Sequence, residues 1–296
     1  MRTPTRPDEL RGRVFRARDA LSAGLLSRDG LRSRAWVRLY RGVYADSSLT
    51  VDHDLRIAGA RLLVPAVGVF GGRTAAHLHG AGELVGPTTP VEVVIPPGVS
   101  FGPVEGLLIR RSPLTSEEIT RRARVACTTA LRTAVDIARH EPLVEGVVAL
   151  DVLLSLRVVA PGELRAAAAI ATGRGCRRAR EVVGLTDGRS ESPQESRLRV
   201  VLGRAGLPPV PQVVVRGLDG SFVARVDLGY PRQRVAVEYD GAWHAEPGQF
   251  AKDRRRLNRL VAAGWTVVHV TAADLHDPAT LTTRVRALLA AREIGE

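Results

Sequence analysis

Three carboxylates and a histidine stand close together in one stretch of the chain, residues 222–244, FVARVDLGYPRQRVAVEYDGAWH. Asp227, Glu238 and Asp240 interrupt two runs in which polarity alternates with the two-residue period of a β-strand. Hard divalent cations such as Mg²⁺ or Mn²⁺ prefer carboxylate oxygens in proteins. The pattern therefore predicts a metal site made of these three carboxylates, with His244 as a further ligand or as a proton acceptor.

A β-hairpin must position these side chains, with its turn at residues 230–233. If the turn is centred between Arg232 and Gln233, Asp227 lies opposite Glu238. Directly opposed Cβ atoms are roughly 5 Å apart, so two like charges there need a positive charge between them. A slip of two residues would instead place Asp227 opposite Asp240 or Ala236. The period also places Glu238 and Asp240 on one face of the strand.

The alternative interpretation is that these are surface carboxylates ion-paired with arginines. The next helix, within GQFAKDRRRLNRLVAAG (248–264), favours the metal site over that alternative. Asp253 falls on the inward stripe of the helix, and a carboxylate there needs a partner. We expect the stripe to consist of Phe250, Leu257, Leu260 and Val261.

The segments ESPQES, RVDLGYP, VAVEYDGAWH and KDRRRLNRLVAAGWTVVHVT, in that order, resemble actinobacterial relatives of the very-short-patch repair endonuclease, within the PD-(D/E)XK nuclease superfamily. The resemblance covers about residues 190–290. It implies a metal-dependent phosphodiesterase fold in which Asp227 is the first-strand aspartate and Glu238 the second acid. His244 falls near the histidine of the repair enzyme. Asp240 stands where the superfamily has its lysine, which leaves the water-activating group open.

Glu195 has two interpretations. Ser192, Pro193 and Glu195 form a capping-box pattern with proline at the first helical position, which gives the glutamate a structural role. It also lies on the helix stripe that faces the sheet, and the superfamily resemblance implies that a first-helix glutamate can join the metal site. From here the expected order is helix, strand, hairpin, helix, strand, helix, which is the order of the nuclease core.

The composition favours a polyanionic partner. The chain has 296 residues, with 43 Lys and Arg against 31 Asp and Glu, a net charge of +12 and a pI near 11.1. Lys252 is the only lysine, so the arginine count by itself says little. No apolar run approaches the roughly 20 residues of a membrane span, and Cys127 and Cys176 are too few for a disulfide framework, which fits a reducing cytoplasm.

The segment 14–46 resembles the winged helix-turn-helix of AbiEi-type antitoxins. We expect a short helix around Ala17–Leu21, a break at Gly24, a second helix from a Ser27 cap, and a basic hairpin. The alternative is a helical docking domain with solvated arginines. DNA contacts are expected from five arginines of this segment: Arg28, Arg32, Arg34, Arg38 and Arg41.

Residues 47–188 are predicted to form a central α+β region. A weaker resemblance to the AbiEi-type antitoxins implies that this region is a linker or interaction domain. His77 and His79 are two residues apart, so on a helix they make a poor metal pair. Asp136 and Asp151 are expected to be surface or capping groups.

The prediction is thus an α/β multidomain protein: a winged helix-turn-helix (1–46), the central α+β region (47–188), and a PD-(D/E)XK restriction-endonuclease-like α/β/α core with a mixed sheet (189–296). The expected function is a metal-dependent DNA endonuclease with Mg²⁺ or Mn²⁺. The alternative is an antitoxin or regulator whose C-terminal domain is a non-catalytic DNA clamp. DNA is the expected partner of the basic residues Lys252, Arg254, Arg255 and Arg256. A second copy of the chain, a toxin protein and an RNA substrate are the other candidates.

Overall fold

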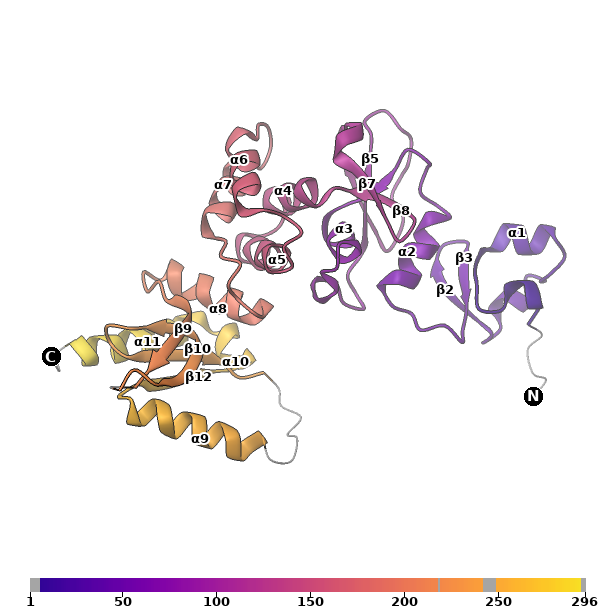
Figure 1. Cartoon of the computed structure of the whole chain (residues 1–296). Helices are drawn as coiled ribbons and strands as arrows, with labels where there is room; N and C mark the ends of the chain where they lie inside the picture. The colour runs from indigo at the N-terminus through magenta and orange to yellow at the C-terminus, as the bar shows by residue number, and fades with distance from the viewer. Residues whose placement is uncertain (1–5, 218, 242–248, 294–296) are drawn as a thin grey trace. The chain divides into compact units, whose positions relative to one another are not determined.

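The computed structural model describes residues 6–217, 219–241 and 249–293, with the backbone alone for 249–251. The chain forms two compact units, residues 1–136 and 137–296. Three sheets and the helices α1–α11 are coloured along the chain in Figure 1. Among the described residues, no helix is both long and apolar enough to cross a membrane.

The first unit begins with a three-stranded antiparallel sheet in the order β1-β3-β2. Its elements are β1 (Val14–Arg16), α1 (Ala17–Ser22), β2 (Trp36–Tyr40) and β3 (Val43–Asp46). The short helix and the break at Gly24, which has a positive φ of 67°, match the expectation. The second helix does not: after the Ser27 hydroxyl accepts from Gly30 N–H, a single 3-10 turn (Gly30–Arg32) leads into β2. Glycine inside so short a segment disfavours a longer helix.

The rest of the first unit is a five-stranded mixed sheet, β6-β5-β4-β8-β7, with two helices. Its strands are β4 (Val69–Phe70), β5 (Val91–Ile95), β6 (Leu107–Arg111), β7 (Ile119–Arg122) and β8 (Val125–Thr128), and its helices are α2 (His53–Arg61) and α3 (Gly72–Leu78). His77 Nε2 lies 2.8 Å from Asp54 Oδ1, and His79 Nε2 lies 2.9 Å from the Thr128 carbonyl, so the two histidines have separate partners.

A helical layer opens the second unit. Its helices are α4 (Ala130–His140, which begins in the first unit), α5 (Leu143–Ser155), α6 (Pro161–Ile170) and α7 (Cys176–Leu185). The expectation that Asp136 and Asp151 lie at the surface is wrong, because their side chains are buried and ion-paired with Arg132 and Arg199. Asp151 is 1% exposed and also accepts from the backbone N–H of Asp187 at 2.7 Å, which ties α5 to the segment that precedes α8.

A four-stranded mixed sheet, β12-β11-β10-β9, forms the remainder of the second unit. The elements are α8 (Pro193–Arg204), β9 (Val210–Arg216), β10 (Phe222–Tyr230), β11 (Val235–Tyr239), α9 (Gln249–Ala262), β12 (Thr266–Val270), α10 (Ala272–His276) and α11 (Pro278–Glu293). The predicted order of helix, strand, hairpin, helix, strand and helix is confirmed, with α10 as an added short helix. The expected boundary at residue 189 lies inside this unit.

Helices cover both faces of this sheet, as Figure 1 shows. On one face, α8 and α11 bury a cluster that includes Leu198, Leu228 and Val285. On the other, α9 packs through Leu260 against Ala236 and Trp265. Val261 was expected on the buried stripe of α9, but it is 60% exposed. Of the neighbouring residues Leu260 and Val261, only Leu260 faces the sheet.

The hairpin has the predicted register. Leu228 pairs with Val237 and Tyr230 with Val235 in antiparallel β10–β11, so the register extended by one residue places Asp227 opposite Glu238. The turn is closed by a hydrogen bond from Arg234 N–H to the Pro231 carbonyl at 3.3 Å. The side-chain period of β11 is therefore fixed, with Val235 and Val237 on the α8 and α11 face and Glu238 on the α9 face.

The buried pair of Asp151 and Arg199 predicts a large and specific stability loss. Replacing Arg199 by alanine leaves a carboxylate that is 1% exposed without its cation, and we expect the free energy of unfolding to fall by about 3–5 kcal/mol. Arg197 joins the same two helices through Glu145, at 2.7 Å, but both side chains are partly exposed. Arg197→Ala should cost less than about 1 kcal/mol. Chemical denaturation of the two variants checks this, and equal losses would contradict it.

Candidate functional site

Asp227 lies where the two strands of the hairpin separate. Its carboxylate Oδ2 accepts a hydrogen bond from the backbone N–H of Tyr239 at 3.2 Å. The last regular pair of β10 and β11 is Leu228 with Val237, so this bond takes the place of the next rung of the ladder. A side chain thus closes the hairpin at its open end, and Asp227 is held between the strands with a partly buried carboxylate.

Glu195 reaches the same region from the first turn of α8. The Ser192 hydroxyl accepts from Glu195 N–H at 3.2 Å, as the capping pattern predicts. The Glu195 side chain does not complete the reciprocal capping box at Ser192. Its Oε2 accepts instead from the Glu191 backbone N–H and from the Gln212 amide, each at 3.0 Å. Only 8% of Glu195 is exposed.

Gln212 connects Glu195 to the sheet. In the antiparallel pairing of β9 and β10, Pro211 pairs with Leu228 and Val213 with Val226, so Gln212 stands opposite Asp227. Its φ is 54°, in the left-handed region. The amide that binds Glu195 therefore starts from the backbone position beside Asp227.

Glu238 is held by an arginine of the neighbouring helix. Arg256 of α9 forms a two-pronged ion pair with it, with Nη1 to Oε2 at 2.7 Å and Nη2 to Oε1. The guanidinium also donates to the Arg225 carbonyl at 2.8 Å. For Glu238, 5% exposed, the structure thus realises the alternative of a carboxylate paired with arginine. Arg256, expected to meet phosphate, faces this acid.

Asp240 takes part in a separate contact. Its Oδ2 lies 2.9 Å from Nδ1 of His269 on β12, and both side chains are 44% exposed. The parallel register pairs His269 with Glu238, so these groups share one face of the sheet. Asp240 therefore has a histidine as its neighbour instead of the two carboxylates with which it was expected to form a site.

The electrostatics of Asp227 record its acidic surroundings. Burial is the main cause that raises the pKa of Asp227, and the nearby carboxylates of Glu195 and Glu238 also raise it. The Tyr239 N–H and Arg256 lower it, and the net pKa is about 6. A carboxylate with two like charges near it is destabilised when it ionises. Either protonation of the carboxylate or a bound cation reduces this repulsion.

The carboxylate oxygens that accept no hydrogen bond determine which ligands this region could bind. Among the described residues, neither Asp227 Oδ1 nor Glu195 Oε1 receives a hydrogen bond, whereas both oxygens of Glu238 are taken by Arg256. Within the described part of the chain, no three acid, histidine or cysteine side chains lie close enough to hold a metal ion. The expected cluster of Asp227, Glu238 and Asp240 is therefore not assembled, because Arg256 and His269 engage two of its members. Two hard oxygens suit Mg²⁺ or Mn²⁺, and Glu238 could join them once Arg256 leaves.

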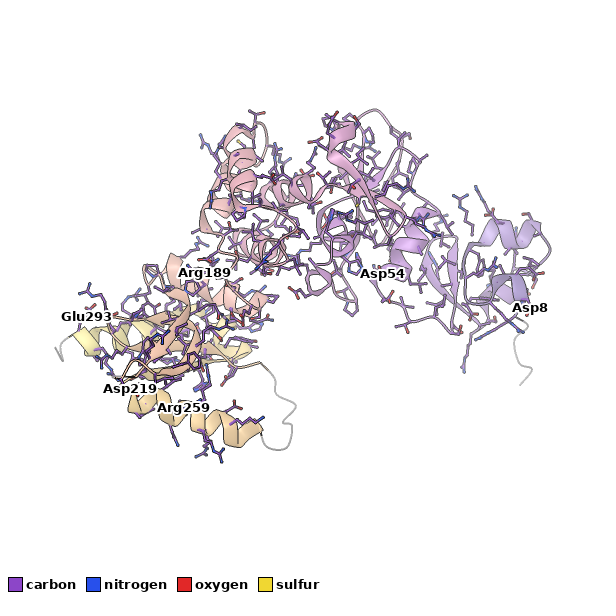
Figure 2. The ribbon with its side chains drawn as sticks, in the orientation of Figure 1. Asp8, Asp54, Arg189, Asp219, Arg259 and Glu293 are labelled. Atoms are coloured by element: carbon purple, nitrogen blue, oxygen red, sulfur yellow. The ribbon has the colours of Figure 1, made fainter. Side chains whose placement is uncertain are left out.

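The basic residues expected at DNA differ in their surroundings. Lys252, Arg254 and Arg255 are exposed on α9, and the side chains of this helix, with Arg259 labelled, are drawn in Figure 2. In the first unit, all five expected arginines are exposed, and Arg32 lies 3.6 Å from Asp29. Their role at DNA stays a prediction. His244 lies outside the described residues.

Sequence reasoning missed two polar residues of this region, Gln212 and His269. Each is the one polar side chain in an otherwise apolar run, VPQVVV for Gln212 and VVHV for His269. A lone polar residue in an apolar strand is a candidate for a specific side-chain contact, and this signal could have found both. The left-handed φ of Gln212 leaves no trace in the residue type.

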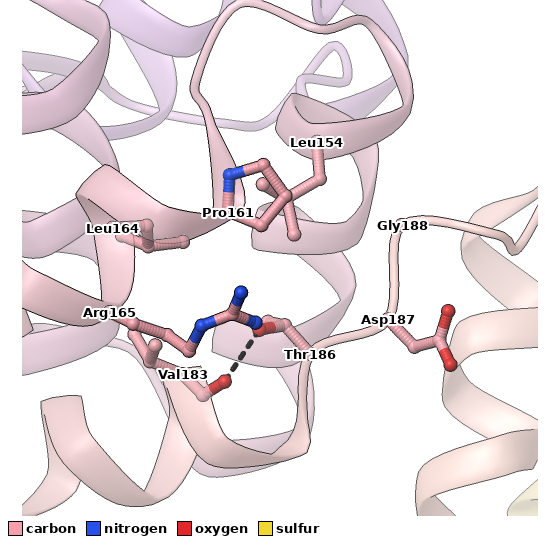
Figure 3. A pocket seen from close by; sticks show the side chains of 8 residues that line it. All are labelled: Leu154, Pro161, Leu164, Arg165, Val183, Thr186, Asp187 and Gly188. Atoms are coloured by element: carbon pink, nitrogen blue, oxygen red, sulfur yellow. Dashed lines mark hydrogen bonds between the residues drawn. The ribbon is translucent and has the colours of Figure 1, made fainter.

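A cavity of about 370 Å³ lies elsewhere in the second unit, between α5, α6 and α7 (Figure 3). Its wall combines the aliphatic side chains of Leu154, Leu164 and Val183 with the polar side chains of Arg165, Thr186 and Asp187. Its only carboxylate, Asp187, is paired with Arg189 at 2.6 Å. The cavity lacks the group of acids found beside Asp227.

Comparisons with known proteins give one match to a solved structure and one pair of relatives. No protein-family model matches the chain. The catalytic domain of the homing endonuclease I-Bth0305I is similar to 33% of this chain and is covered over 94% of its own length, with 21% identity and a TM-score of 0.28.

The relatives come from two strains of Mycobacterium tuberculosis. They are the uncharacterized protein Rv2248 of strain H37Rv and the uncharacterized protein MT2308 of strain CDC 1551. Each is 34% identical over 259 residues, which cover 84% of this chain and 90% of the relative. The chain therefore belongs to the same family as these two mycobacterial proteins.

Proposed function

We propose that this protein is a divalent-metal-dependent DNA endonuclease with its active site at Asp227. The observation that supports the proposal is the position of Asp227 at the point where the hairpin strands separate, with Glu238 opposite it on β11 and Glu195 of α8 hydrogen-bonded to the facing Gln212. The exposed basic residues of α9 and the net charge of +12 suit a polyanionic substrate. The fold proposed for residues 189–296 is that of the PD-(D/E)XK nucleases.

The chain's own residues have distinct roles in this proposal. Asp227 and Glu195 would hold the cation, and the Tyr239 N–H and Gln212 fix the orientation of the two carboxylates. A bound Mg²⁺ or Mn²⁺ would supply Lewis-acid chemistry, which polarises the scissile phosphate and makes water a better nucleophile. Arg256 stabilises Glu238 in the absence of the cation. Lys252, Arg254 and Arg255 bind the phosphates of the DNA strand.

Proton transfer is assigned to His269. Its Nδ1 lies against Asp240, which leaves Nε2 for a water molecule on the face that carries Glu238. His244, the candidate from the sequence, would serve the same step or complete the cation's ligands. Both roles belong to the proposal.

One observation favours a second function, a DNA-binding regulator with a non-catalytic nuclease-like domain. The two-pronged ion pair of Arg256 with Glu238 already neutralises one of the three acids. A site stabilised in this way could persist without any cation. Binding of DNA through the exposed arginines of residues 28–41, without cleavage, is what this alternative expects.

The substitution Asp227→Asn tests the endonuclease. We expect it to lower Mg²⁺-dependent nicking of supercoiled plasmid at least about a hundredfold, because the uncharged amide removes the central anionic ligand, while DNA binding in a gel-shift assay is unchanged. The matched control is Asp277→Asn, the same charge change at an exposed cap of α11. Wild-type protein that binds plasmid without cutting it in any divalent metal would support the regulator instead.

The raised pKa of Asp227 predicts opposite pH effects on metal binding and on stability. Since Asp227 keeps its proton up to about pH 6, affinity for Mn²⁺ should fall about tenfold per pH unit below 6, as protons compete with the cation. Isothermal titration calorimetry between pH 5 and 8 measures this. An affinity that does not change over that range would contradict the assignment.

The metal-free protein should behave in the opposite sense. The folded-state pKa of about 6 exceeds the ordinary value of 3.8, so the folded protein binds the Asp227 proton more tightly and loses stability as pH rises between these values. The substitution Asp227→Asn removes this loss of stability at higher pH, because the amide does not ionise. Its Tm should exceed that of the wild type by a few degrees at pH 8 and by much less at pH 4. A thermal melt in chelator checks the sign.

A further inference from the structure

Gln212 is the one described non-glycine residue with a left-handed φ inside a strand. The other four, Ala123, Arg124, Arg157 and Arg234, lie in turns or at a helix end. A glutamine at a φ of 54° is strained, and strain of this kind persists only where surrounding contacts enforce it. The position of this strain, directly opposite Asp227 in the sheet, calls for an explanation.

The distorted backbone has one visible consequence, the direction of the Gln212 amide. The ladder of β9 and β10 runs regularly on both sides, with Pro211 opposite Leu228 and Val213 opposite Val226. Only the residue between them leaves the extended conformation. From there Nε2 donates to Glu195 Oε2 at 3.0 Å.

The hydrogen bond from Gln212 to Glu195 Oε2 determines the direction of the other carboxylate oxygen, Oε1. Oε2 accepts two N–H groups, from Gln212 and from the Glu191 backbone, while among the described residues Oε1 accepts none. Two donors on one oxygen restrict the rotation of a buried carboxylate. The free Oε1 is then the atom left to meet a cation, and Asp227 stands opposite Gln212, the residue that holds Glu195.

We propose that Gln212 is a positioning residue that holds Glu195 as a cation ligand next to Asp227, at the expense of local backbone strain. The inference rests on the proposed metal-dependent function and adds a residue to it. Such partners of metal ligands typically change metal affinity by about 10–100-fold when they are replaced. A residue with a purely structural role would affect stability and affinity in the same direction.

The substitution Gln212→Gly separates the two roles, because glycine adopts a φ of 54° without strain and has no amide to donate. We expect Tm in chelator to be unchanged or higher, while the dissociation constant for Mn²⁺ in calorimetry rises at least about tenfold. Gln212→Asn keeps an amide and tolerates the left-handed region, but it is one methylene shorter, and it should fall between wild type and Gly.

The matched control is Gln233→Ala, which removes an amide that binds the Glu293 carboxylate at 2.8 Å, at the turn of the same sheet. It should leave Mn²⁺ affinity unchanged. If Gln212→Gly binds Mn²⁺ as tightly as wild type, or loses Tm and affinity together, the positioning role is overturned while the endonuclease proposal stands. If the wild-type protein itself binds no Mn²⁺, the proposed function fails, and this inference fails with it.

Discussion

The structure of the second unit depends on holding carboxylates together in a place with little water. Asp227, Glu195 and Glu238 come from three different elements, and each is partly or fully buried. Like charges in such surroundings repel strongly, so every hydrogen bond around them acts against that repulsion. The N–H groups of Tyr239, Glu191 and Gln212 and the Arg256 guanidinium serve this purpose. The raised pKa of Asp227 indicates that the compensation is incomplete.

Under the proposed function, Arg256 would give the site two alternative states. With its guanidinium on Glu238, the acidic group carries its own positive charge and is stable in the absence of a cation. A divalent ion beside Asp227 would compete with that guanidinium for Glu238, and the released arginine would lie on α9, among the exposed Lys252, Arg254 and Arg255. The same residue would then serve the carboxylate in one state and a phosphate in the other. The interpretation as an ion-paired acid and the interpretation as a metal ligand therefore describe two occupancies of one position.

The sequence predicted the strand alternation, the hairpin register and the order of elements, because these follow from local periodicity and turn chemistry. The sequence did not predict contacts that depend on a side chain from a distant part of the chain. The pairing of Glu238 with Arg256 and of Asp240 with His269 joins separate elements, and no spacing rule distinguishes these contacts from a shared cation. The burial of Asp151 by Arg199 and the left-handed Gln212 were equally invisible. In the first unit, the second helix was predicted from a cap that is present, but the segment is too short to propagate a helix beyond one 3-10 turn.

Helix α8 links the acidic site to the helical layer of the same unit. Its first turn carries Glu195. Two and four residues further on, Arg197 and Arg199 bind Glu145 and Asp151 of α5. The buried pair is the stronger constraint, because neither charge can leave its partner without being stranded away from water. A shift of α5 would therefore be transmitted along α8 to Glu195, and from Glu195 to Gln212 and the sheet. A carboxylate that is displaced by about an ångström is a poorer ligand. Under the proposed function, the helical layer would therefore support the position of Glu195 without contributing a group to the chemistry.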